Sequence, residues 1–110
     1  MSFIDLNTIE GKEVVPGFNG KFIHSDNMTL AFWTIKAGHS LPEHKHPHEQ
    51  IANVIEGKIE LIVGEKKQIL TKGTCIIIPA NVPHSGKAIT DCFLIDVFYP
   101  VREDLKSKKD

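Results

Sequence analysis

The sequence predicts a small all-β protein of one domain, and three observations lead to this prediction. The chain has 110 residues, which is enough for one hydrophobic core but not for two. Glycine and proline recur at short intervals, and the segments between them are rich in β-branched and aromatic residues. No segment combines a sustained 3.6-residue apolar period with capping residues, so we expect almost no helix.

Six segments have the length and composition of strands. They are residues 28–36, 50–56, 58–63, 67–71, 74–78 and 92–99. Gly57, Gly64 and Gly73 fall between them, where tight turns need a positive φ. Short strands at this spacing predict a sandwich or barrel. We expect one barrel domain over residues 1–102, followed by a polar, frayed tail at 103–110.

Two of these segments predict a second layer of structure. Residues 28–35 and 92–99 are apolar on both faces of the expected strand, so both faces should be covered. In a small barrel one face lines the interior. The other face then predicts contact with a second subunit, and we expect a homodimer.

Composition and charge exclude several classes of protein. Hydrophobic residues make up 41% and charged residues 25%, the balance of a soluble globular protein. The net charge of −1 argues against a nucleic-acid or membrane partner held by bulk electrostatics. No apolar run approaches the roughly 20 residues of a membrane span, and no basic-then-apolar signal pattern begins the chain. We therefore expect a cytoplasmic protein.

Histidine clustering predicts a metal site. Four of the six histidines fall between residues 39 and 48. His44 and His46 are two apart, so on a strand they share one face at about 7 Å and can converge on one ion. Gln50 has the same parity, although Pro47 interrupts the strand, and His84 would arrive from a later strand.

Three imidazoles and one amide oxygen suit a catalytic transition metal with open positions better than a closed structural site. We predict that His44, His46, Gln50 and His84 bind one divalent ion, whether Ni, Zn, Co, Mn or Fe. On the His44 and His46 pair alone, exposed loop histidines without a ligand role remain an alternative.

The spacing around these residues resembles the two motifs of the cupin superfamily. Glycines at 38 and 57 flank the first motif, which contains His44, His46 and Gln50. The second runs from Gly73 through Pro79 to His84 with Asn81 in place of a glycine and Ala88 in place of the final asparagine. The resemblance covers residues 38–88 and implies a double-stranded β-helix, the jelly-roll barrel.

Gln50 stands where most cupins carry glutamate. A neutral amide leaves the charge of the ion uncompensated, whereas a carboxylate would offset part of it. We therefore expect Gln50 to bind the ion more weakly and leave it a stronger Lewis acid.

The last predicted strand carries a second group of polar residues. Asp96 and Phe98 share one face of an apolar segment, where a carboxylate is costly unless it is paired or lies near a metal. Burial would raise the pKa of Asp96 and a nearby cation would lower it, both conditions of a general base. Arg102 could bind a substrate carboxylate in bidentate fashion. The alternative is an Asp96–Arg102 ion pair that closes the barrel rim.

Residues 44–50 (HKHPHEQ) and 96–104 (DVFYPVRED) are similar to segments of the small cupins of pectin and alginate breakdown. Those proteins open the ring of 4,5-unsaturated uronates to give the linear keto form. The resemblance implies Asp96 and Arg102 as catalytic residues, Phe98 and Arg102 as substrate contacts, and a small acidic sugar as partner. His48 shares the ligand parity and is a candidate substrate or acid–base contact, or else a partly exposed loop histidine.

The sequence therefore leaves three possible functions. The first is a metal-dependent enzyme for uronate ring opening. The second is a metal-dependent dioxygenase, which would consume oxygen and have little need of Asp96 or Arg102. The third is a non-catalytic cupin that uses the metal to bind a sugar or another small ligand. The ligand would then stabilise the protein and would not be turned over.

Overall fold

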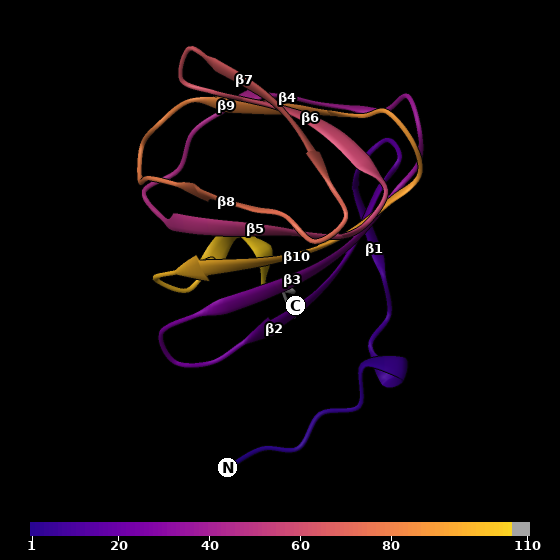
Figure 1. Cartoon of the computed structure of the whole chain (residues 1–110). Helices are drawn as coiled ribbons and strands as arrows, with labels where there is room; N and C mark the ends of the chain where they lie inside the picture. Colours follow the sequence, from indigo (N-terminus) through magenta and orange to yellow (C-terminus); the bar gives the residue numbers. More distant parts are fainter. Residues whose placement is uncertain (107–110) are drawn as a thin grey trace.

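A computed structural model describes residues 1–106 of the chain. Within these residues the strands form two antiparallel sheets that face each other as a barrel (Figure 1). The strands are β1 Lys12–Val15, β2 Phe18–His24, β3 Thr29–Ile35, β4 Ser40–His44, β5 Glu49–Glu56, β6 Lys58–Val63, β7 Lys66–Thr71, β8 Cys75–Ile78, β9 His84–Ala88 and β10 Cys92–Tyr99. Two short 3-10 helices, η1 Leu6–Thr8 and η2 Glu103–Leu105, lie before and after them. The predicted all-β jelly-roll class is confirmed.

One sheet has the strand order β1-β2-β3-β10-β5-β8 and the other has the order β4-β9-β6-β7. All six strands that the sequence bounds are present, and no boundary differs by more than one residue. Strands β1 and β2 were not predicted, and β4 and β9 were expected only as the strands that carry the candidate histidines, without bounds. Strand β4 contains Pro42, and β9 is short and polar, so neither has the β-branched composition that identified the others.

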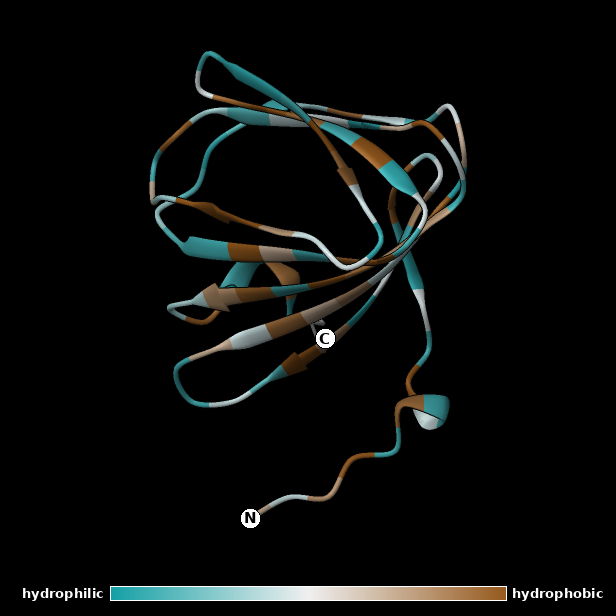
Figure 2. Cartoon of the chain, in the orientation of Figure 1, coloured by the Kyte–Doolittle hydropathy of each residue, from teal (hydrophilic) through white to brown (hydrophobic). Residues whose placement is uncertain are grey.

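The barrel interior is apolar at one end and polar at the other. The apolar core consists of Phe18, Ile35, Val54, Ile59, Leu61, Leu70, Ala88, Cys92 and Leu94. Strand β10 connects the two ends, because alternate residues from Cys92 to Phe98 are buried and the second half of this series includes Asp96. Figure 2 shows apolar residues along the strands and mostly hydrophilic residues at turns such as β2–β3.

On the outer face of the six-stranded sheet, several apolar side chains are exposed to solvent in the single chain. Ile51 and Ile77 are cross-strand partners on β5 and β8 and are 37% and 63% exposed. Tyr99 at the end of β10 is also exposed. This is the face on which the sequence predicts a second subunit.

The segment predicted to be a polar tail begins with η2. Leu105 in this turn is half-buried and lines the cavity described below. Residues 107–110 of the predicted tail lie outside the described residues. Among the described helices, none is long and apolar enough to cross a membrane.

Gly57 in the β5–β6 turn has a φ of +91°. A Cβ atom there would lie 2.2 Å from the backbone oxygen of Asp91, and a backbone atom cannot rotate away. We expect Gly57→Ala to lower the free energy of unfolding by about 2–4 kcal/mol, through the strained φ and this contact together. Urea unfolding of the metal-free protein measures the change.

Gly73→Ala is the matched control, because Gly73 has a φ of +83° with no atom near the added Cβ. It should cost only the conformational part, about 1–2 kcal/mol. Equal losses in the two variants would contradict the role of the Asp91 contact.

Candidate metal centre

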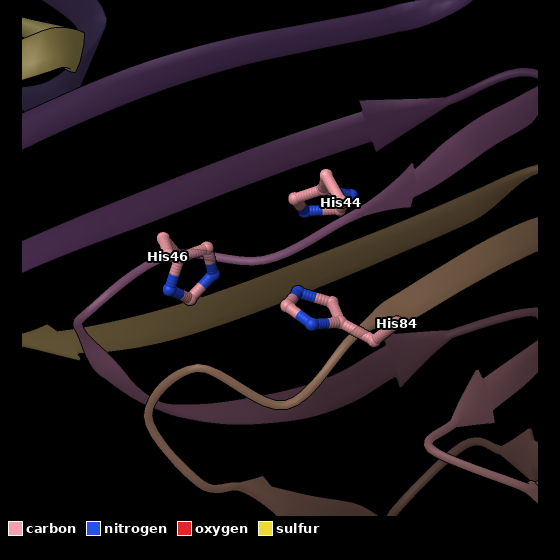
Figure 3. A group of neighbouring side chains, drawn as sticks. All are labelled: His44, His46 and His84. Carbon is pink, nitrogen blue, oxygen red and sulfur yellow. The ribbon is translucent and has the colours of Figure 1, made fainter.

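Three histidines meet at the polar end of the barrel. His44 ends β4, His46 lies in the loop that follows, and His84 begins β9 as the register partner of His44. One ligand atom from each lies within 4.8 Å of the others, and Figure 3 shows the three rings turned toward a common space. His46 and His84 are buried.

The reason for this convergence differs from the one expected. We predicted that strand alternation would place His44 and His46 on one face. Strand β4 ends at His44, so His46 owes its position to the loop instead. The turn through Pro47 carries the chain from β4 in one sheet to β5 in the other, and the His46 ring points back between them.

Hydrogen bonds fix the tautomer of all three rings. The Nδ1 atoms of His44, His46 and His84 lie 2.8, 3.0 and 2.9 Å from the backbone oxygens of Pro42, His48 and Val82. A carbonyl oxygen only accepts, so each Nδ1 donates its proton and each Nε2 keeps a lone pair. Metal-binding histidines are oriented by such bonds. The buried Nε2 of His84 has no hydrogen-bond partner among the described residues.

Gln50 on β5 completes the group. Its Oε1 lies 3.1 Å from His46 Nε2, and its Nε2 donates to Asp96 Oδ2 at 3.0 Å. The first pair consists of two acceptors, because the proton of His46 is on Nδ1.

A second proton on His46 would resolve this contact, but burial, together with the charges of Arg102 and His84, lowers the pKa of His46 to about 4. The doubly protonated ring is therefore scarce at neutral pH. A cation between the two atoms fits instead, since two ligands at about 2.1 Å from one ion lie roughly 3.0–3.4 Å apart. The residues present suit a divalent transition metal.

Asp96 lies beside this centre in the barrel interior. It is 5% exposed, and burial raises its pKa to about 7 although the Gln50 amide, the Trp33 indole and Arg102 act in the opposite direction. Its Oδ1 is buried with no hydrogen-bond partner among the described residues. One oxygen is therefore held by Gln50, and the other remains available to a ligand.

The alternative of an Asp96–Arg102 ion pair is wrong. Arg102 pairs with Asp104 instead, with Nε 2.9 Å from Oδ1 and Nη2 2.7 Å from Oδ2. Asp104 follows Arg102 by two residues and lies in turn η2, so it is the nearer carboxylate. Asp96 instead accepts a hydrogen bond from Gln50.

The guanidinium of Arg102 lies over the Phe98 ring, 4.7 Å from its centroid. The Phe98 ring in turn meets the His46 ring edge-on, with centroids 5.6 Å apart. Phe98 therefore separates the cation from the metal centre. The charge of Arg102 still lowers the pKa of His46, of His84 and of Asp96.

All of these groups except His46 line one cavity of about 330 Å³, a size within the range of small-molecule sites. Its polar lining includes His44, Gln50, His84, Asp96, Arg102 and Asp104, and Phe98 lines it beside them. The remaining lining is largely apolar and comes from the barrel core.

His48 occupies a different position from the other predicted site residues. Its backbone oxygen accepts from His46 Nδ1, so its main chain orients a ligand. Its ring is half-buried, with Nδ1 unpaired among the described residues, and lies 5.4 Å from the His46 ring. Like His46, it is absent from the described residues that line the cavity.

Sequence reasoning missed two kinds of site residue. The first kind is the backbone carbonyls that orient the histidines, which any residue type can supply and which the sequence therefore cannot identify. Asp104 could have been found, since an acidic residue two positions after a predicted carboxylate-binding arginine is a plausible partner for it.

The Cupin domain family matches residues 31–98. The pectin degradation protein KdgF of Dickeya dadantii is 32% identical over 105 residues, which cover 93% of this chain and 94% of that protein. The structure of KdgF from Halomonas sp. superimposes with a TM-score of 0.90 at 27% identity, covering 96% of this chain and 99% of the other. A RmlC-like cupin from Shewanella frigidimarina also gives 0.90, at 25% identity and 96% of both chains.

Asp96→Asn tests the orientation of Gln50. The new amide can donate to the Gln50 oxygen, so the Gln50 amide is expected to turn its NH₂ group toward the histidines. We expect the affinity for Co²⁺ or Ni²⁺, measured by calorimetry on the metal-free protein, to fall about 10–100-fold. Unfolding stability without metal should stay within about 1 kcal/mol, because a hydrogen bond between the two side chains is kept.

The double variant Gln50→Glu with Asp96→Asn is the rescue, since the new amide then donates to the new carboxylate and an oxygen again faces the histidines. It should recover metal affinity. Gln50→Glu alone places two carboxylates together and should destabilise the metal-free protein. Gln50→Leu removes the amide oxygen altogether, and unchanged metal affinity in that variant would show that the Gln50 oxygen is not a ligand.

Proposed function

The chain belongs to the cupin family, and we propose that it opens the ring of 4,5-unsaturated uronate sugars to the linear keto form during pectin or alginate breakdown. The observation that carries the proposal is the position of Asp96. Its free oxygen lies in the same cavity as the histidine–glutamine centre and Arg102. The similarity to pectin degradation proteins supports the substrate class.

The reaction is an isomerisation that moves one proton. The proton of the hemiacetal hydroxyl on C1 leaves, C1 becomes an aldehyde, and the bond from C1 to the ring oxygen breaks. The resulting enolate at C5 becomes a ketone when C4 takes up the proton that left the hydroxyl, so protons balance. A divalent transition metal held by His44, His46, Gln50 and His84 would supply Lewis-acid polarisation of a substrate oxygen.

Asp96 is the proposed proton carrier. Gln50 fixes one of its oxygens, which leaves Oδ1 to accept the hydroxyl proton and return one to C4. Arg102 is proposed to bind the substrate carboxylate, because a guanidinium matches a carboxylate in bidentate geometry. Phe98 is proposed to shape the pocket between Asp96 and Arg102. The half-buried ring of His48 remains a proposed contact for the substrate.

The cavity favours this reaction over the two alternatives. A dioxygenase needs the metal centre but has little use for a buried carboxylate and an arginine beside it, and both line the cavity here. A non-catalytic sugar-binding cupin would use Arg102, but it has no need of a carboxyl group whose pKa burial raises to about 7, as for Asp96.

The metal-loaded protein is expected to accelerate the loss of ultraviolet absorbance of an unsaturated uronate, as the double bond disappears. Asp96→Ala should lower the rate by about 10²–10⁴-fold, the range for loss of a general acid–base group. Removal of the metal with a chelator should also abolish the acceleration.

Glu65→Gln in the exposed β6–β7 turn is the control and should match the wild type. Metal content is measured in each variant, so that loss of metal is distinguished from loss of proton transfer. A wild-type rate equal to the uncatalysed rate, or full activity in metal-loaded Asp96→Ala, would exclude this function.

We further propose that the chain forms a homodimer through the outer face of the six-stranded sheet. Ile51 and Ile77 lie adjacent on this face, and contiguous exposed apolar side chains mark interaction surfaces. Ile77→Glu should give a monomer in sedimentation or light-scattering measurements. Ile69→Glu is the matched control, since Ile69 is 51% exposed on β7 of the other sheet. A monomeric wild type at micromolar concentration would contradict the dimer.

A further inference from the structure

Asp104 has no assigned role, yet it forms both hydrogen bonds of a bidentate ion pair with Arg102. We propose that Asp104 is a positioning residue, which holds the Arg102 guanidinium over Phe98 so that its other edge binds the carboxylate of an acidic sugar. The proposal rests on the function proposed above for its carboxylate-binding step only.

The donor geometry leaves room for a second carboxylate. A guanidinium has five N–H donors in a fixed plane. Asp104 takes the Nε proton and one Nη2 proton. The two Nη1 protons and the second Nη2 proton remain, and they form an edge that also matches a carboxylate in bidentate fashion.

Burial indicates which edge faces which way. The Asp104 side chain is 59% exposed, whereas that of Arg102 is only 12% exposed. Both residues line the cavity, and Asp104 is the more exposed of the two, so it contacts the guanidinium at the solvent-facing mouth. The edge of the guanidinium away from Asp104 is then the one that remains for a ligand deeper in the cavity.

The other contacts of Arg102 restrain it in the same position. Its backbone N–H donates to the Thr29 hydroxyl at 2.9 Å, and Thr29 is fully buried on β3. Its guanidinium lies over Phe98. Turn η2 holds Asp104 in place, because Leu105 N–H donates to the backbone oxygen of Arg102 at 3.1 Å.

Charge provides a further reason for the pair. Arg102 lines the same cavity as the candidate metal ligands His44, Gln50 and His84, so its cation lies near the place where a divalent ion would bind. Without a partner, the guanidinium would be repelled by a divalent ion and could turn into solvent. Asp104 offsets that repulsion from the solvent side.

The opposite role is that Asp104 imitates the substrate carboxylate and must be displaced. The two roles predict opposite signs. If Asp104 positions Arg102, its neutralisation weakens binding of acidic sugars. If Asp104 competes for Arg102, its neutralisation strengthens binding.

The test uses the metal-loaded full chain with Asp104→Asn. We expect KM for the unsaturated uronate to rise on the order of tenfold. This is a small effect for the loss of a charged hydrogen bond, because Asp104 is partly exposed. The value of kcat should change less than about twofold. Asp104→Glu should recover part of the affinity. Glu103→Gln is the matched control, since Glu103 lies in the same turn but pairs with Lys106.

Direct binding separates this inference from the ring-opening reaction. D-Galacturonate, a saturated acidic sugar, is titrated into each variant, with D-galactose as the uncharged control. Weaker galacturonate binding in Asp104→Asn supports the inference even if the wild type turns over no unsaturated uronate. Unchanged or tighter binding in Asp104→Asn, or no galacturonate binding by the wild type, would overturn it.

Discussion

The hydrogen bond from Gln50 to Asp96 joins the two halves of the site, the candidate metal centre and the proposed proton carrier. It exists because β5 and β10 are neighbours in a register that pairs Gln50 with Phe98 and Asp96 with Ala52. Both polar side chains then face the barrel interior, two residues apart across the strands. A shift of one residue would turn one partner to the outer face, so the site depends on this strand pairing.

At the polar end of the barrel some buried polar groups are paired and others are not. Backbone oxygens accept from the three imidazoles, and the Gln50 amide nitrogen donates to Asp96. The groups without a hydrogen-bond partner among the described residues are informative. A buried group without a partner costs about 1–3 kcal/mol, and His84 Nε2 and Asp96 Oδ1 are two such groups. They lie where the proposed metal and substrate would bind, so ligands would recover this cost.

Much of the fold could be predicted from the sequence, because strands such as Cys92–Tyr99 have strong β composition and regular turns. The bounds of β4 and β9 could not be predicted, because these strands are polar or interrupted by proline and form through pairing with neighbouring strands. The four candidate ligands were identified by motif and spacing. The loop position of His46 and the pairing of Arg102 with Asp104 both depend on the path of the chain beyond the end of a strand. The alternation of side chains along a strand does not determine that path.

The neutral amide of Gln50 follows from the presence of Asp96. Its Nε2 is the donor that this carboxylate needs on the buried side, and a glutamate there would set two carboxylates against each other. With the amide in place, Asp96 keeps its second oxygen free, and a bound metal would keep its full charge. The residue that departs from the common cupin pattern therefore permits a carboxylate beside the metal centre, which is the feature that the proposed proton transfer requires.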